Sequence, residues 1–132
     1  MIPGYYDNRR MLRIGSTVLG VSDVRRAAEF WGRALGYVPR DEIEETWAVL
    51  SPPDGAGQNI SLMRTDTPVQ EKPRVHLDLY SPNPVEEIDR LLGLGATRVD
   101  WTDYPPDADF TVLADTEGNR FCVIDTGHVS SP

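Results

Sequence analysis

The amino-acid sequence contains two similar halves, and this internal repeat constrains the fold more than any other feature. Each half begins with an apolar run, at 16–21 in the first half and at 76–80 in the second, followed by a stretch of helical periodicity. The order of segments recurs after roughly 60 residues, and the small differences in spacing fall between segments, where insertions cost little. Two copies of one supersecondary unit usually form their site where the copies face each other. Functional residues are therefore expected at matched positions.

Each half is predicted to fold in the order strand, helix and three strands. Apolar residues between Val24 and Leu35 repeat at the spacing of one helix face, and Gly36 terminates this helix. In the second half, Asn83 is the expected N-cap and Pro84 occupies the first helical position. Further strands are predicted at 47–50, 60–63, 110–113 and 121–124.

Alternation along these strands divides their side chains between two faces. Leu19, Leu62, Leu79 and Val123 share the face that the helices are expected to cover. The opposite face carries polar and sulfur-containing side chains, which is typical of the wall of a wet cleft. Its expected members are Ser16, Ser61, Met63, His76, Asp78, Tyr80 and Cys122. Aromatic residues elsewhere are interpreted either as core or as flat walls for a planar ligand, namely Trp47, Trp101, Tyr104 and Phe110.

Composition restricts the class of protein and of partner. The 132 residues, 39% of them hydrophobic, suit one compact soluble domain. A net charge of −8 disfavours nucleic acid and anionic lipid as partners, and no apolar stretch approaches the roughly 20 residues of a membrane span. The single cysteine, Cys122, excludes an internal disulfide and suits a reducing cytoplasm. We expect an N-terminal extension at 1–12, one domain at 13–126 made of modules 13–64 and 74–126, and a tail at 127–132.

Several short motifs resemble those of a known superfamily. They lie at 21–23, 28–31 and 35–37 in the first half, and at 76–79 and 113–121 in the second. Together they resemble the vicinal-oxygen-chelate superfamily, which includes glyoxalase-like and bleomycin-resistance-like domains. The resemblance implies an α+β fold in which two tandem βαβββ modules form a cupped mixed β-sheet with the helices on its outer face. It also implies a homodimer, formed edge to edge or by exchange of modules.

The resemblance also implies four matched positions that hold metal ligands in metal-using members. In this sequence they are Ser16, Ser61, His76 and Cys122, and only His76 is an accustomed ligand. Because serine hydroxyls are poor ligands for divalent ions, we predict no metal and no cofactor. A site made of His76, Asp78 and Cys122 is the alternative.

Two functions remain open on this sequence. The first is metal-free binding of a small, planar or cationic organic molecule, as in antibiotic-sequestering members of the superfamily. The second is a glyoxalase-like lyase or isomerase, with or without a divalent metal, in which His76 acts as an acid or base. His76 and Cys122 also have structural interpretations, as a hydrogen-bonding residue of the cleft and as a small buried hydrophobe. The predicted ligand-binding residues are Ser16, Trp47, Ser61, Met63, His76, Asp78, Tyr80, Trp101, Tyr104, Phe110 and Cys122.

Overall fold

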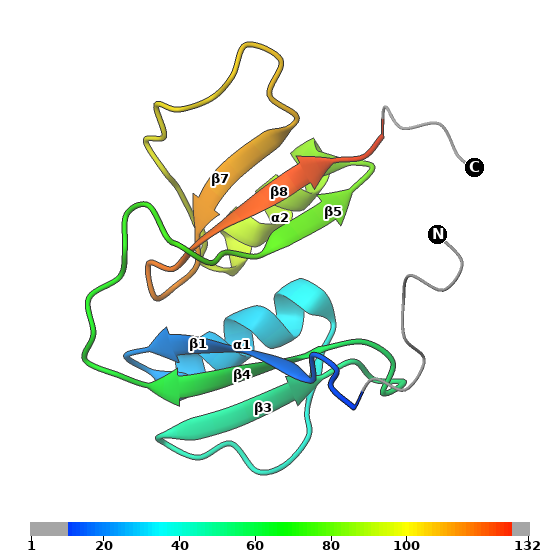
Figure 1. The fold of residues 1–132 in the computed structure, drawn as a ribbon, viewed down its shortest axis with the longest axis vertical. Helices are drawn as coiled ribbons and strands as arrows, with labels where there is room; N and C mark the ends of the chain where they lie inside the picture. The colour runs from blue at the N-terminus through cyan, green and yellow to red at the C-terminus, as the bar shows by residue number, and fades with distance from the viewer. Residues whose placement is uncertain (1–10, 128–132) are drawn as a thin grey trace.

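The computed structural model describes residues 11–127, which form two successive βαβββ modules (Figure 1). The first module contains β1 (Ser16–Val21), α1 (Val24–Leu35), β2 (Val38–Pro39), β3 (Trp47–Ser51) and β4 (Asn59–Arg64). The second contains β5 (Asp78–Ser81), α2 (Pro84–Leu94), β6 (Thr97–Arg98), β7 (Phe110–Ala114) and β8 (Arg120–Asp125). The predicted order of elements and the α+β class are confirmed. The extension at 1–12 and the tail at 127–132 lie almost wholly outside the described residues.

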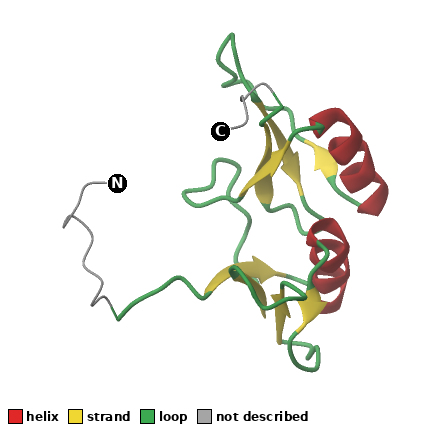
Figure 2. Ribbon diagram, turned by 90° about the vertical axis from the view of Figure 1, so that its right-hand side faces the viewer, coloured by secondary structure: helices red, strands yellow, loops and turns green. Residues whose placement is uncertain are grey.

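Each module builds its own four-stranded mixed sheet. The strand orders are β1-β4-β3-β2 and β5-β8-β7-β6, and β1 pairs with β4, as β5 does with β8, in parallel. The modules are stacked with the edge strands β1 and β5 toward each other (Figure 1), and both helices cover the same side of the two sheets (Figure 2). Within residues 11–127, the cupped surface is therefore made of two sheets rather than of one continuous sheet.

The predicted strand faces are confirmed. Leu62 and Val123 are buried in the core beneath the helices, whereas Val18 and Tyr80 on the opposite face are 48% and 75% exposed. One boundary differs, because β5 begins at Asp78 rather than at residue 76. In the segment ahead of this strand, the Leu77 carbonyl accepts a backbone hydrogen bond from the Cys122 N–H of β8. His76 thus lies in the segment that leads into the sheet.

The helices begin and end near the predicted residues, with one difference in capping. The Asp23 side chain accepts a hydrogen bond from the Arg26 N–H at the start of α1, and Gly36 ends this helix with a φ of 69° that favours glycine. Asn83 occupies the N-cap position of α2, but its side chain makes no capping hydrogen bond. The expectation that Asn83 caps through its side chain is therefore wrong. Pro84 at the first helical position has no backbone N–H, so no donor is left unpaired there.

The cores of the two modules are continuous through an aromatic cluster. Trp31 of α1 packs edge-on against Phe30 and against Phe121 of β8, with ring centroids 5.1 and 5.2 Å apart. The indole Nε1 of Trp31 donates a 3.0 Å hydrogen bond to the buried carboxylate of Asp115, in the hairpin between β7 and β8. Burial raises the pKa of Asp115 above its ordinary value, against the lowering effect of its hydrogen bonds.

The second module also contacts both ends of α1. At the N-terminal end, the Glu117 carboxylate accepts hydrogen bonds from the Ser22 N–H, the Ser22 hydroxyl and the Arg26 guanidinium. At the C-terminal end, Arg90 of α2 donates to the carbonyls of Arg33 and Ala34. An anion at the start of a helix and a cation at its end both stabilise the helix dipole.

We expect Glu117→Gln to lower the free energy of unfolding by about 1–3 kcal/mol, because an amide NH₂ replaces the oxygen that accepts from Arg26 and the negative charge at the start of α1 is lost. Burial of Glu117 opposes ionisation, but the hydrogen bonds from Ser22 and Arg26 outweigh it and lower the pKa of this carboxyl. The stabilisation is therefore present above the ordinary carboxyl pKa and disappears as the pH falls through the lowered one. Urea denaturation of the wild-type and Glu117→Gln proteins at a series of pH values from 7 downward measures this difference in the free energy of unfolding. The exposed Glu42→Gln variant is the control, and equal stability of all three proteins would contradict the assignment.

Candidate functional site

The helix-free face of the second module contains a cavity of about 530 Å³. It lies over β5, β7 and β8 and is closed at one side by the segment that joins the modules. We refer to it as the second-module cavity. Predicted site residues that line it are His76, Asp78, Tyr80, Trp101, Phe110 and Cys122.

A hydrogen-bonded pair of polar side chains lies at this cavity. The Nε2 atom of His76 is 2.9 Å from Oδ1 of Asp78, and both side chains are a little under half exposed. Asp78 is also the register partner of Cys122 on β8. The ligand-forming atoms of His76, Asp78 and Cys122 all lie within 4.8 Å of one another. The contact between His76 and Asp78, which the sequence left open, is therefore formed.

The Cys122 side chain is a buried thiol at the floor of the cavity. Burial, and then the negative charge of Asp78, raise the pKa of Cys122 to about 11. At neutral pH the sulfur is therefore protonated, which makes it a poor nucleophile.

Aromatic side chains form the walls of the second-module cavity. Tyr80, Trp101 and Phe110 line it. Tyr104 has a different place, because its ring packs on Phe110 with centroids 5.2 Å apart and its hydroxyl accepts a 2.8 Å hydrogen bond from the Val112 N–H. Tyr104 thus braces the loop between β6 and β7 and does not line this cavity.

The remaining predicted residues belong to a separate cavity of about 440 Å³ on the first module, the first-module cavity. Ser16, Trp47 and Ser61 line it, and the hydroxyl oxygens of the two serines are 2.6 Å apart. Met63 pairs in register with Trp47 on the same sheet and is 46% exposed, outside the cavity lining.

In the described chain, Ser16 and Ser61 line one cavity, whereas His76 and Cys122 line another. His76 also lines a cavity between the modules, together with Thr17 and Val18 of β1. The prediction that the four side chains converge on one cleft stays a prediction. The four positions also do not fit the metal site of metal-using relatives. Two of them, Ser16 and Ser61, carry neutral hydroxyls bonded to each other, which are poor ligands for a divalent ion.

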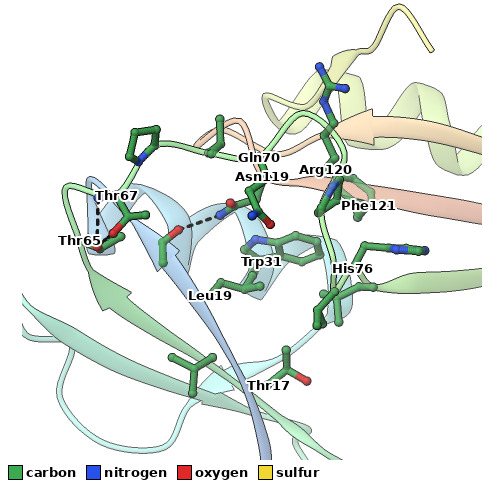
Figure 3. Close-up of a pocket in the computed structure, with 17 residues that line it drawn as sticks. Thr17, Leu19, Trp31, Thr65, Thr67, Gln70, His76, Asn119, Arg120 and Phe121 are labelled. Atoms are coloured by element: carbon green, nitrogen blue, oxygen red, sulfur yellow. Dashed lines mark hydrogen bonds between the residues drawn. The ribbon is translucent and has the colours of Figure 1, made fainter. Parts of the chain in front are cut away.

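A third cavity of about 280 Å³ lies between the modules, under the connecting segment that follows β4 (Figure 3). Trp31 and Leu19 form its inner side, and Asn119 crosses it to donate a 2.8 Å hydrogen bond to the Gly20 carbonyl. The His76 side chain extends away from Trp31 in this view.

Sequence reasoning missed several residues of the second-module cavity. Alternation already assigns Ile124 to this face with Cys122, and the same signal is sufficient for Val112, the register partner of Cys122. The residues Lys72 and Pro73 come from the connecting segment, which has no periodicity that would place it over the sheet.

The sequence matches the family model of the glyoxalase-like domain over residues 16–124, and the chain belongs to this family. No curated protein matches the sequence. Among solved structures, a glyoxalase-related enzyme from Fulvimarina pelagi is similar, with 16% identity, coverage of 87% of this chain and 88% of the other, and a TM-score of 0.63. A possible glyoxalase from Bacillus cereus has 20% identity, coverage of 86% and 98%, and a TM-score of 0.61.

The bleomycin-binding protein of Streptomyces verticillus, solved with copper(II)-bleomycin, is 15% identical, with coverage of 88% and 98% and a TM-score of 0.58. Similarity at these identities shows a shared fold.

In residues 11–127, no helix has the length and apolar character to cross a membrane.

We expect Cys122 to react with iodoacetamide at pH 8 at least about tenfold more slowly than the same thiol in the urea-unfolded chain. The rate should keep rising beyond pH 9, because the pKa of Cys122 is about 11. Asp78→Asn removes a neighbouring negative charge and should shift the profile to lower pH. Asp109→Asn, at another carboxylate of the same cavity, is the matched control. A rate that levels off near pH 8.5, as for an ordinary thiol, would contradict the raised pKa.

Proposed function

We propose that this protein binds a small planar organic molecule, cationic or neutral, in the second-module cavity. The observation that carries the proposal is the combination of aromatic walls with one polar pair. Tyr80, Trp101 and Phe110 line the same cavity as the bonded His76 and Asp78. A mostly apolar pocket with a few convergent polar groups is the usual form of a small-molecule site.

The charges around the second-module cavity favour a cation over an anion. The carboxylates of Asp78 and Asp109 line it. Lys72 and Arg120 also line it, but Asp103 lies 3.0 Å from Lys72, so carboxylates outnumber basic groups among the described residues around the cavity. Aromatic faces also attract a cation. The overall charge of −8 acts in the same direction.

Binding without a metal is part of this proposal. It is supported by the donors that line the cavity, since among the described residues His76 is their only imidazole and the two serines line another cavity. The solved complex of the bleomycin-binding protein with copper(II)-bleomycin provides an example of ligand binding on this fold. Elemental analysis of the purified protein tests this part. Near one equivalent of zinc, nickel, manganese or iron per chain would instead favour the metal-dependent enzyme.

A lyase or isomerase that uses His76 as acid or base is the alternative function. The 2.9 Å contact between His76 and Asp78 favours it, because a carboxylate can orient an imidazole and stabilise its protonated form. The two functions are separable, since an enzyme would convert a carbonyl compound that a binding protein would release unchanged.

We expect proflavine, a flat aromatic cation, to raise the melting temperature and to bind in calorimetry more tightly than neutral or anionic aromatics of similar size. His76→Ala should weaken binding by about 1–2 kcal/mol through a lost hydrogen bond, and Trp101→Ala should weaken it by a similar amount. Trp47→Ala is the matched control, because Trp47 belongs to the other cavity. Chelator should leave binding unchanged. Equal affinity for anionic aromatics, or full binding by Trp101→Ala, would refute the proposal.

We propose that the protein forms a homodimer. Its cytoplasmic location stays a prediction. Exposed apolar side chains outside the two cavities support association, since Met63 of β4 and Val85 of α2 are 46% and 75% exposed. We expect light scattering at micromolar concentration to give twice the chain mass of 14.7 kDa. A single species of one chain mass would contradict the dimer.

A further inference from the structure

We propose that the first-module cavity binds the carboxylate group of a small organic acid. This site is distinct from the proposed ligand site of the second module and does not depend on it. The residues on which the inference rests are Arg13, Ser16, Arg40, Trp47, Asn59 and Ser61, all of which line the cavity.

The charge of the cavity is opposite to that of the whole chain. The protein has 21 Asp and Glu against 13 Lys and Arg, yet two arginines and no acidic residue line this cavity among the described residues. The nearby Asp54 accepts the Ala56 N–H inside its own turn. Asp41 contacts Arg40 at 2.9 Å, but both side chains are more than half exposed, and exposed pairs of this kind contribute little. Arg40 is thus available to an anion.

The two serine hydroxyls leave a donor for the same anion. Ser16 and Ser61 together carry two hydroxyl hydrogens, and their 2.6 Å contact uses one of them. The other contact from the Ser16 hydroxyl, to the Thr17 carbonyl, is long at 3.5 Å. Guanidinium groups beside a free hydroxyl hydrogen match the several acceptor sites of a carboxylate.

Hydrogen bonds of the main chain anchor the positions that carry some of these side chains. The Arg40 N–H donates to the Val49 carbonyl at 2.8 Å, and the Asn59 N–H donates to the Gly15 carbonyl at 2.9 Å. The β1–β4 ladder places Val18 opposite Ser61. Such anchoring lowers the entropy cost of ordering a ligand.

The apolar side of the cavity selects an organic acid over an inorganic anion. Trp47, which is 38% exposed, and the aliphatic Val18 and Val49 lie beside the polar group. A flat or apolar body attached to the carboxylate would cover these side chains, whereas sulfate would leave them in water.

Titrations followed by ¹H–¹⁵N NMR at constant ionic strength test the site with sodium benzoate, neutral benzamide and sodium sulfate as probes. Benzoate should cause saturable shifts at the amides of Asn59 and Ser61 and at the Trp47 indole, and should bind about tenfold or more tightly than benzamide or sulfate. Arg13→Ala and Arg40→Ala should each raise the dissociation constant for benzoate by about tenfold.

Two controls separate this site from general effects and from the second-module cavity. Arg98→Ala removes an exposed arginine from β6 of the other module and should leave benzoate binding unchanged, as should Trp101→Ala. Benzamide or sulfate binding as tightly as benzoate would overturn the proposal. Wild-type affinity in both Arg13→Ala and Arg40→Ala would overturn it as well.

Discussion

The arrangement of the two modules depends on the hairpin between β7 and β8, which carries the Glu117 carboxylate to the start of α1. The sheets of the described chain share no ladder, so other contacts must set the angle between them. The hairpin provides these contacts, through Glu117 to Ser22 and Arg26 and through Asn119 to the Gly20 carbonyl. Arg90 holds the opposite end of α1. A single helix is thereby oriented at both ends by the module to which it does not belong.

The two modules have the same order of strands and helix but carry different side chains on their helix-free faces. Matched positions on the helix-free face carry a serine pair in the first module, and His76 with Cys122 in the second. The surroundings also differ, because, within residues 11–127, two arginines and no carboxylate line the first-module cavity, whereas Asp78 and Asp109 line the second beside Lys72 and Arg120. Charge therefore separates the ligands that the two cavities would select.

The boundaries of both cavities come largely from segments outside the regular strands. Lys72 and Pro73 close one side of the second-module cavity, and Tyr104 braces the loop that carries Trp101 by accepting the Val112 N–H. Arg13 and Arg40 likewise lie outside β1 and β3. Binding residues on loops that are supported by a rigid sheet are common, since loops can vary without disturbing the core.

The sequence by itself determined the order of elements, the helix ends at Gly36 and Gly95, and the face to which each strand residue points, because periodicity and glycine conformation are local properties. It also identified six of the thirteen residues that line the second-module cavity, since alternation places Asp78 and Cys122 on one face. Only the tertiary structure decided that Ser16 and His76 lie in separate cavities, that Asp78 reaches His76, and that Tyr104 supports a loop rather than lining a site. These outcomes depend on the angle between two sheets and on the paths of aperiodic segments, which are set by contacts between residues far apart in the chain, such as Glu117 and Ser22.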